Sequence, residues 1–350
     1  RSTYLNIRFD EDGRYRCAYK PKGTVTGRLA SAETYWGTGG NHQNVPEEFR
    51  VFVVADPGTF FGAIDKKGAE WVVVAYASGD KQMMYVCEHG IDPHAHTAHL
   101  MTGLSYEAIK AEARDSREGG AGVSTNPDVI QEVRRKLILE GYDEFDKARW
   151  LPRTMTARQC GKKSNHGLNY QEGANKFALV NEISIPEAQR IIDLYTKEAY
   201  PGLSQWWGAT AFTLRQTRTL VNCFGRKWVF KGPMNDETLR QAIAFIPQST
   251  VVDMTNRGLI YMDRELTRMI PLIQKHDEIL YAYSFRDLDR HFDDLSRLCT
   301  SLSPVVEYGG RRFKIENDFS CGLSWGSLQK VKIDEQETRG IISSLLGKGG

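Results

Sequence analysis

The sequence predicts an α+β fold in which strands and hairpins near both ends of the chain flank a helical segment. Three observations predict it: a short apolar run at 59–65, two apolar runs within 272–283 that flank a polar triplet, and amphipathic patterns with helix-capping residues between them. With 350 residues, 41% of them hydrophobic and 26% charged, the chain can bury a substantial core. No apolar run approaches the roughly 20 residues that cross a bilayer, so we expect no membrane segment.

The N-terminal part predicts strands, turns and one helix. RYRCAYKPKG (14–23) alternates and ends in Pro and Gly, which predicts a hairpin arm, and the acidic residues at 10–12 before a glycine predict a solvated turn. TFFGAID (59–65) predicts a short buried strand. In AEWVVVAYAS (69–78) three valines favour a strand, but the length and the Gly-Asp that ends the run favour a helix, which we predict.

The middle of the chain predicts helices. SYEAIKAEAR (105–114) is amphipathic, and a Gly/Ser/Asn/Pro-rich loop follows it at 116–128. Residues 129–149 and 156–179 also predict helices. PEAQRIIDLYTKEAY (186–200) opens with a proline at a first helical position and ends before Pro-Gly. LIQKHDEILYAY then predicts a hairpin with HDE at its tip.

One helical stripe carries two cations, an imidazole and a phenol. Arg158, Lys162, His166 and Tyr170 recur at a spacing of four, so each step turns only about 40° around a helix and rises about 6 Å. Such a stripe suits a charged, elongated ligand with an aromatic end, such as a triphosphate joined to a sugar and base. Residues 147–171 hold six Lys or Arg and no Asp or Glu, so we expect no carboxylate to compete for these cations.

Charge and cysteine usage limit the class of protein. The formal net charge is only +2, which does not by itself indicate nucleic-acid binding, but residues 13–32 hold five basic and no acidic residues. The six cysteines include no CxxC pair, which argues against a zinc ribbon or a disulfide framework and favours a reducing cytoplasm. Because the chain starts at Arg1 rather than at Met, we expect it to be a fragment or a processed product.

Two aspartates are placed where divalent cations are often held. Asp65 ends the predicted buried strand, and Asp277 lies at the tip of the predicted hairpin. Magnesium takes one or two protein carboxylates together with phosphate oxygens of a substrate, and two such ions can assist an in-line displacement. A single aspartate in a turn is more often structural. The prediction of a metal site therefore depends on the combination with the cationic stripe.

These segments together resemble the polymerase domain of family A DNA polymerases, the group of bacterial DNA polymerase I and its phage relatives. Seven segments resemble motifs of this family in the same order along the chain. They are TVTGRLAS (24–31), NHQNVP (41–46), DKKGAEWVVVAYASGD (65–80), DPHAHTA (92–98), RQCGKKSNHGLNY (158–170), PQST (247–250) and HDE (276–278).

The resemblance implies a right-hand polymerase fold. Its palm would be an antiparallel sheet backed by helices and formed by residues 1–91 and 226–350, and its fingers would be the helical insertion 92–225. The thumb is expected to be largely missing from this chain.

The resemblance also implies a catalytic centre with two magnesium ions, for which Mn²⁺ would be able to substitute. Asp65 and Asp277 would bind the ions with help from the backbone carbonyl of Lys66, and Glu278 would support the metal site. Lys162 would join these carboxylates as a catalytic residue.

For the incoming dNTP, the resemblance implies that His94, Arg158 and Lys162 hold the triphosphate, which prefers charge-assisted contacts. Tyr170 would lie under the templating base pair. Glu70 would crowd the 2′ position of the sugar and so favour deoxynucleotides.

For the DNA, the resemblance implies that Arg28 and Gln248 contact the minor groove of the primer–template, where all base pairs share acceptor positions. His276 would approach the primer terminus.

Four positions depart from the family pattern. His166 stands where Phe or Tyr is usual, and we hypothesise that it contacts the sugar or the β-phosphate and alters tolerance of 3′-modified nucleotides. The alternative is a neutral packing histidine. Gln171 replaces a glycine, Gly68 a glutamine and Ala244 an asparagine, changes that concern groove contacts and fidelity rather than the metal site. Such divergence suggests a phage enzyme.

The predicted function is therefore template-directed DNA synthesis on a primer 3′-hydroxyl, in replication or repair. The expected partners are primer–template DNA and dNTPs, with a monomeric chain, a processivity or replisome partner, and a cytoplasmic location, in the bacterial host if the source is a phage. One alternative is a single-subunit RNA polymerase, against which Glu70 argues. Another is a catalytically inactive primer–template binding module, against which the intact Asp65, Asp277, Arg158 and Lys162 argue.

Overall fold

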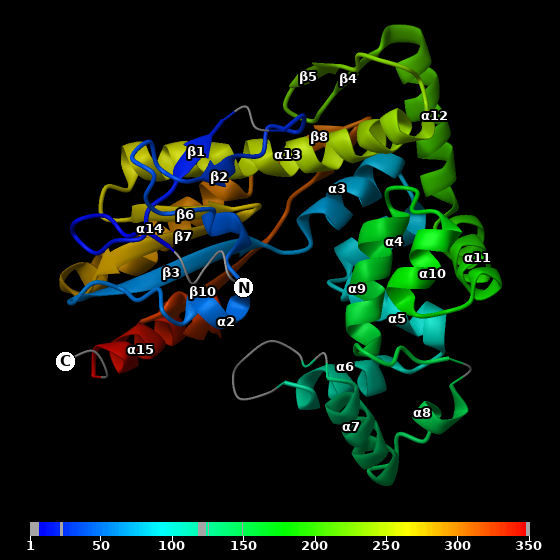
Figure 1. The fold of residues 1–350 in the computed structure, drawn as a ribbon, viewed down its shortest axis with the longest axis horizontal. Coiled ribbons are helices and arrows are strands. Elements are labelled where there is room, and N and C mark those ends of the chain that lie inside the picture. The colour runs from blue at the N-terminus through cyan, green and yellow to red at the C-terminus, as the bar shows by residue number, and fades with distance from the viewer. Residues whose placement is uncertain (1–6, 22–23, 118–123, 125, 149, 348–350) are drawn as a thin grey trace.

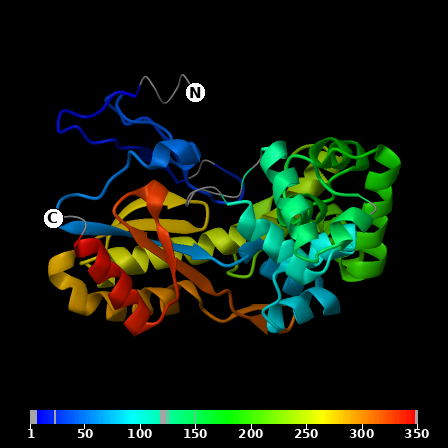
Figure 2. The ribbon, with the colours of Figure 1, turned by 90° about the horizontal axis from the view of Figure 1, so that it is seen from below.

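The computed structural model describes residues 7–21, 24–117, 124, 126–148 and 150–347. A half built around a sheet, with the N-terminal segment on one side of that sheet, lies next to a mainly helical half (Figures 1 and 2). The long helix α13 (Asp236–Glu265) runs along the sheet-bearing half toward the helical half (Figure 1). None of the described helices is both long and apolar enough to cross a membrane.

A five-stranded antiparallel sheet forms the core of the first half, in the order β11-β10-β3-β7-β6. Its strands are β3 (Thr59–Lys66), β6 (Ile270–Lys275), β7 (Glu278–Ser284), β10 (Asn317–Gly322) and β11 (Gln329–Val331). The helical half lies between β3 and β6 in the sequence, together with α13 and the short antiparallel pair β4 (Thr219–Val221) and β5 (Lys227–Val229). The neighbouring strands β3 and β7 thus bring together residues that lie more than two hundred positions apart.

Alternation along β3 explains the two faces of this sheet. Phe60 and Ile64 point to one face, where they pack against α13, α14 (Leu288–Leu302) and α15 (Glu335–Leu346). Phe61 and Ala63 point to the other face and pack against the N-terminal segment around Val45. Position 65 continues the second row, which places the Asp65 side chain at the exposed end of that face.

The helical half owes its short helices to capping residues. At the start of six helices, the side-chain oxygen of the N-cap residue accepts a hydrogen bond from a backbone N–H of the first turn. These N-cap residues are Asp80 for α4, Asp92 for α5, Ser105 for α6, Asn126 for α7, Thr156 for α9 and Ser184 for α11. The helices are α3 (Ala69–Ser78), α4 (Lys81–Glu88), α5 (Pro93–Thr102), α6 (Tyr106–Asp115), α7 (Pro127–Leu139), α8 (Glu144–Lys147), α9 (Ala157–Leu168), α10 (Ala174–Asn181), α11 (Ile185–Asp193), the π-helical segment η2 (Leu194–Ala199) and α12 (Pro201–Thr217).

Shorter elements complete the fold. They are β1 (Ala18–Lys20), β2 (Ala30–Ala32), η1 (His42–Asn44), α2 (Glu47–Arg50), β4 (Thr219–Val221), β5 (Lys227–Val229), η3 (Phe285–Asp287), β8 (Val306–Tyr308), β9 (Arg311–Phe313) and η4 (Trp325–Ser327). The predicted arm at 14–23 contributes β1, which pairs with β2, while positions 22 and 23 lie outside the described residues. The predicted turn after residues 10–12 is confirmed, because the Gly13 N–H donates to the Asp10 carbonyl at 2.8 Å.

Several predicted elements are confirmed at nearly their predicted bounds. The strand at 59–65, the helices at 69–78 and 105–114, and the hairpin at 272–283 are all present, although Glu278 already belongs to β7. The helix predicted at 186–200 continues as a π-helical segment and ends before Pro201. Of the loop predicted at 116–128, residues 118–123 and 125 lie outside the described residues.

The two long predicted helices were wrong, because each is divided in two. The first breaks between α7 and α8, where Gly141 has a φ of 103°. The second breaks between α9 and α10, where Gln171 adopts a φ of 60°. A left-handed residue cannot continue a right-handed helix. Gln171, which departs from the glycine of the family pattern, thus keeps the backbone conformation that glycine adopts most easily.

Candidate active site

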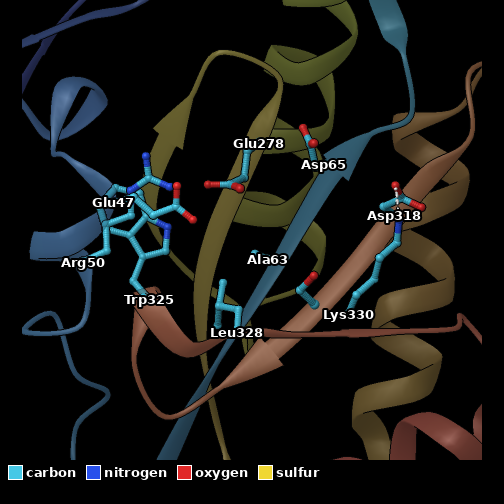
Figure 3. Close-up of a pocket in the computed structure, with 11 residues that line it drawn as sticks. Glu47, Arg50, Ala63, Asp65, Glu278, Asp318, Trp325, Leu328 and Lys330 are labelled. Carbon is cyan, nitrogen blue, oxygen red and sulfur yellow. Dashed lines mark hydrogen bonds and ion pairs between the residues drawn. The ribbon is translucent and has the colours of Figure 1, made fainter. Parts of the chain in front are cut away.

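Four carboxylates lie at one end of the central sheet. Asp65, near the end of β3, lies opposite Asp318 of β10 in the strand register. Asp277 lies in the tight turn between β6 and β7, next to His276 with a φ of 56°, and Glu278 begins β7. Figure 3 shows Asp65 between Glu278 and Asp318 at the rim of a cavity of about 290 Å³. The fold thus brings Asp65 and Asp277 together, as the sequence predicted for a metal site.

The carboxylates destabilise one another's charged forms. Asp65 keeps an open face to solvent but has protein on its other sides, and this desolvation, followed by the charges of Asp277 and Glu278, raises its pKa to about 7. Desolvation, followed by the charge of Glu70, raises the pKa of Asp277 as well. The Oε1 atom of Glu278 is buried and has no hydrogen-bond partner among the described residues. A bound cation would relieve all three effects.

This donor set fits magnesium better than a metal with an all-protein ligand shell. Among the residues that the structure describes, no three Asp, Glu, His or Cys side chains converge as a ready-made metal site. Magnesium does not need such a site, because it commonly uses one or two carboxylates and completes its shell with water and substrate phosphate.

Two further residues at this end of the sheet belong to different environments. Lys66 is buried on the opposite face of the sheet, where its ammonium donates to the Leu302 carbonyl and desolvation lowers its pKa to about 8. Asp318 forms an ion pair with Lys330 at 2.7 Å, so its charge already has a partner. The mutual repulsion therefore centres on Asp65, Asp277 and Glu278.

The pKa of Asp65 gives a prediction for stability. Its ordinary value is 3.8 and its value in the folded chain is about 7, so between these pH values the folded state binds more protons than the unfolded state. Without metal, thermal stability is expected to fall as the pH rises from about 4 to about 7. At pH 8, Mg²⁺ is expected to restore it by binding the folded state only. Melting curves at pH 5 and pH 8, in EDTA or Mg²⁺, measure this; an identical melting temperature at pH 8 with and without Mg²⁺ contradicts it.

The cationic stripe lies on α9 and in the turn that follows it. Arg158, Lys162 and His166 are on the helix, and Tyr170 lies one residue beyond the C-cap Asn169. His166 is exposed, and its ring meets the Tyr170 ring edge-on at a centroid distance of 5.7 Å. The ring of His166 thus packs on Tyr170 at the protein surface, and both its contact with a nucleotide and the alternative of a packing histidine stay predictions.

Helix α5 brings His94 beside this stripe. A Cβ atom at Gly161 of α9 would overlap the carbonyl oxygen of His94, so a glycine is needed for the two helices to pack this closely. The Nδ2 atom of Asn165 lies 3.2 Å from the His94 Nδ1 atom and orients the ring. Desolvation lowers the pKa of His94 to about 4, and the charges of Arg158 and Lys162 also lower it. His94 is thus a neutral imidazole at pH 7.

One expectation about the stripe was wrong, because a carboxylate does compete for it. The Arg158 Nε atom donates to the Asp92 Oδ2 atom at 2.6 Å, while the other Asp92 oxygen caps the first turn of α5 by accepting from the His94 N–H at 2.9 Å. A window of sequence around Arg158 shows only its neighbours in the chain, and Asp92 comes from another helix. An arginine has further N–H groups, so Arg158 remains able to bind phosphate while it contacts Asp92.

A hydrogen-bonded network joins the stripe to the sheet. The Tyr170 hydroxyl donates to the Glu70 Oε2 atom at 2.5 Å, and the Arg28 guanidinium forms an ion pair with the Glu70 Oε1 atom. The side chain of Gln248, on α13, also interacts with the Tyr170 hydroxyl. The network fixes the Glu70 carboxylate from two sides. The sequence suggested a role for each member but not that they contact one another.

A groove of about 1240 Å³ lies between α9, α10 and α13. Lys162, His166 and Tyr170 line it from α9 and the following turn, and Arg240 and Ala244 line it from α13. Arg240 lies outside every motif of the sequence and was not predicted as a site residue, and neither were Asp92, Asn165 and Asp318. A helical periodicity that relates Arg240 to Ala244 is the only signal in the sequence that could have indicated Arg240.

His276 lies apart from this groove, exposed in the β6–β7 turn. Desolvation, followed by the charges of Arg28 and Lys275, lowers its pKa. The His276 ring therefore lies near Arg28, and His276 directly precedes Asp277 of the carboxylate centre.

The site thus combines a carboxylate centre, a row of cations and a glutamate held by two hydrogen-bond partners. The model of the family described as DNA polymerase family A matches residues 2–118 and 147–327 of the chain. The chain belongs to DNA polymerase family A. The predicted α+β fold with an antiparallel sheet is that of the family's polymerase domain. The polymerase domain of Pol1 from M. smegmatis, solved in complex with DNA primer-template and dNTP, superposes with a TM-score of 0.68 at 19% sequence identity, over 93% of this chain and 50% of that one.

Curated relatives agree with this family assignment. DNA polymerase I of Chloroflexus aurantiacus is 26% identical over 303 residues, which are 80% of this chain and 26% of the relative. The DNA polymerase of Mycobacterium phage D29 is 25% identical over 331 residues, 93% of this chain and 44% of the relative. Thermostable DNA polymerase I of Thermus aquaticus is 24% identical, over 80% of this chain and 30% of the relative. This family A chain therefore spans less than half the length of these relatives.

Proposed function

We propose that this chain is the catalytic part of a template-directed DNA polymerase, which adds dNTPs to a primer 3′-hydroxyl in replication or repair. The observation that carries the proposal is the meeting of Asp65, from β3, with Asp277, from the β6–β7 turn, at one end of the sheet. Mg²⁺-dependent primer extension on a DNA template tests it. We also propose that residues 1–91 and 226–350 form the palm and residues 92–225 the fingers.

Asp65, Asp277 and the Lys66 carbonyl would hold two Mg²⁺ ions, with Glu278 supporting them. The ions would lower the pKa of the primer hydroxyl and stabilise the charge that develops on the leaving phosphate. The raised pKa values of Asp65 and Asp277 in the metal-free chain support this assignment. Negative charge is concentrated at this end of the sheet, and two divalent cations would neutralise it.

The helical half would position the triphosphate. Arg158 and Lys162 supply positive charge along one face of α9, and His94 supplies a neutral ring with one N–H donor. Fixed donors and cations around phosphate oxygens contribute most of the catalysis in phosphoryl transfer, because they need no rearrangement when charge develops. Tyr170, at the end of the same stripe, would lie under the new base pair.

Arg28, Gln248 and His276 would contact the primer–template. Arg28 contacts Glu70 and Gln248 contacts Tyr170, the two partners of one hydrogen bond, so both would approach the duplex next to the nascent pair. The M. smegmatis Pol1 domain that shares this fold was solved with DNA primer-template and dNTP, which supports the same ligands here.

Replacing Glu70 by alanine is expected to raise the use of ribonucleotides relative to deoxynucleotides by at least about tenfold. The carboxylate, which Tyr170 and Arg28 fix, would occupy the space that a ribose 2′-hydroxyl needs. Competing rNTP and dNTP incorporation at one template position measures the ratio. Glu70→Gln is the matched control, since it keeps the side-chain volume and should keep the exclusion. An unchanged ratio in Glu70→Ala would refute the role and reopen the RNA polymerase alternative.

Replacing His166 by tyrosine is expected to change the incorporation of dideoxynucleotides relative to dNTPs by several-fold. We propose that the exposed imidazole of His166, at the rim of the groove, contacts the sugar or the β-phosphate. A phenol at this place is longer than an imidazole and lacks its two ring nitrogens. Chain-termination assays with both substrates measure the ratio. An identical ratio in the wild type and in His166→Tyr would show that His166 does not contact the nucleotide.

A further inference from the structure

A buried ion pair connects the helical segment α6–α7 to the start of α9. Arg134, on α7, and Glu112, on α6, have exposed side-chain fractions of only 4% and 0%. Helix α7 lies between the two ranges that match the family model, so Arg134 is not part of the matched polymerase segments. Figure 1 shows α6 and α7 packed together at the end of the helical half, beneath α9.

The Arg134 guanidinium is bonded in three directions. Its Nε atom donates to the Glu112 Oε1 atom at 2.6 Å, its Nη1 atom to the Pro152 carbonyl at 2.7 Å, and its Nη2 atom to the Met155 carbonyl at 3.3 Å. The second oxygen of Glu112 accepts from the Ala157 N–H at 2.7 Å. Apart from the ion pair, these hydrogen bonds connect Arg134 and Glu112 to the segment that leads into α9, at Pro152 and Met155, and to Ala157, the first residue of α9.

The position of these bonds matters for the proposed nucleotide site. Ala157 is the first residue of α9, and Arg158 follows it directly, with Lys162 one turn later. A carboxylate at a helix N-terminus satisfies a free N–H group and interacts favourably with the helix dipole. Without Glu112 and Arg134, the first turn would depend on its local cap, in which Thr156 and Gln159 bond each other's backbone N–H groups.

The Arg134–Glu112 ion pair does more than fill space in the core. Burying two charges costs desolvation, and two apolar side chains of similar volume often pack equally well at such a place. Burial raises the pKa of Glu112, while the adjacent Arg134 opposes that rise. An apolar pair could not bond the carbonyls of Pro152 and Met155 or the N–H of Ala157. The ion pair thus supplies a defined geometry at the start of α9.

We propose that Arg134 is a positioning residue that, through Glu112 and the two carbonyls, fixes the first turn of α9 and thereby places Arg158 and Lys162 for the triphosphate. This inference rests on the proposed function. Helix α7 would therefore contribute to nucleotide binding, although it lies outside the ranges that match the family model and none of its side chains lines the groove.

The test compares Arg134→Met with Arg135→Met, an exposed arginine on the same helix, and with the double variant Glu112→Met/Arg134→Met. Primer extension gives the KM for dNTP and kcat, fluorescence anisotropy gives the Kd for primer–template, and thermal melting gives stability. Arg134→Met is expected to raise the KM for dNTP by about tenfold or more, because a small misplacement of binding groups is costly, and to leave the Kd for DNA within about twofold. Arg135→Met is expected to match the wild type.

The double variant separates positioning from stability. Because it removes the unpaired buried carboxylate, it is expected to regain most of the melting temperature lost in Arg134→Met while its KM for dNTP stays raised. Arg134→Lys, which keeps the charge but offers no planar fork, is expected to fall between the wild type and Arg134→Met. An unchanged KM in Arg134→Met, or a KM that recovers together with the melting temperature in the double variant, would overturn the proposal.

Hydrogen exchange keeps this test independent of polymerase activity. The amides of the first turn of α9, residues 157–160, are expected to lose protection in Arg134→Met and in the double variant but not in Arg135→Met. If the wild type extends no primer, the proposed function fails, but the positioning role of Arg134 can still be tested. Unchanged protection at 157–160 in Arg134→Met would overturn that role, and lost protection would support it.

Discussion

Replacing Asp277 by asparagine is expected to slow Mg²⁺-dependent primer extension by at least about a thousandfold, since a metal contributes several kcal/mol of charge stabilisation and each 1.4 kcal/mol is about tenfold in rate. The asparagine side chain would fill the same space in the β6–β7 turn but carry no charge for a cation. Single-turnover extension of one nucleotide measures the rate. Binding of primer–template is expected to remain, because Asp277 repels rather than attracts the DNA backbone.

The same substitution has a second consequence that distinguishes lost catalysis from lost folding. Removing the Asp277 charge takes away one cause of the raised pKa of Asp65, so the metal-free variant is expected to melt at a higher temperature than the wild type at pH 8. Asp318→Asn is the matched control, because Asp318 lies opposite Asp65 but is paired with Lys330, and its charge raises the pKa of Asp65 less than the charge of Asp277 does. Extension by Asp277→Asn within tenfold of the wild type would contradict the metal assignment.

Replacing Lys162 by methionine is expected to lower the efficiency of dNTP incorporation by about 100- to 1000-fold, the usual effect of removing one fixed donor from developing charge. Lys162 lies exposed on α9, one turn from Arg158 and beside the neutral His94, where it would meet the triphosphate. Methionine keeps the length and apolar stem of the side chain. Nucleotide titrations at saturating primer–template measure kcat and KM separately.

Lys163→Met provides the control for this prediction. Lys163 is also exposed and also borders the groove, but it lies about 100° around α9 from Lys162 and outside the stripe. It is expected to change the efficiency by no more than a few-fold. Equal losses in the two variants would mean that general positive charge, rather than the stripe, attracts the nucleotide.

Local patterns in the sequence were sufficient for the elements that carry most of the site. The apolar run before Asp65, the two runs around the HDE triplet and the spacing of four from Arg158 to Tyr170 predict β3, the β6–β7 hairpin and α9. The helix at 69–78 was predicted in spite of its three valines, because the run ends at Gly79, which adopts the left-handed conformation typical of a helix end.

Contacts between distant segments could not be predicted in this way. Asp92 reaches Arg158 because two helices pack closely at Gly161, and neither the packing nor the register of β10 against β3 leaves a periodic signal in the chain. The break at Gln171 was missed for a local reason: glutamine rarely adopts a positive φ, so nothing in the residue type marks the end of α9. Such contacts are specified by tertiary packing rather than by local propensity.

Primer extension by this chain on a DNA template, with dNTPs or rNTPs and with Mg²⁺ or EDTA, tests the central proposal most directly. The proposed function predicts extension with dNTPs and Mg²⁺ only, which stops at the template end and disappears in Asp277→Asn. Tight binding of primer–template without extension would contradict it and indicate a binding module. Equally efficient extension with rNTPs would instead indicate an RNA polymerase.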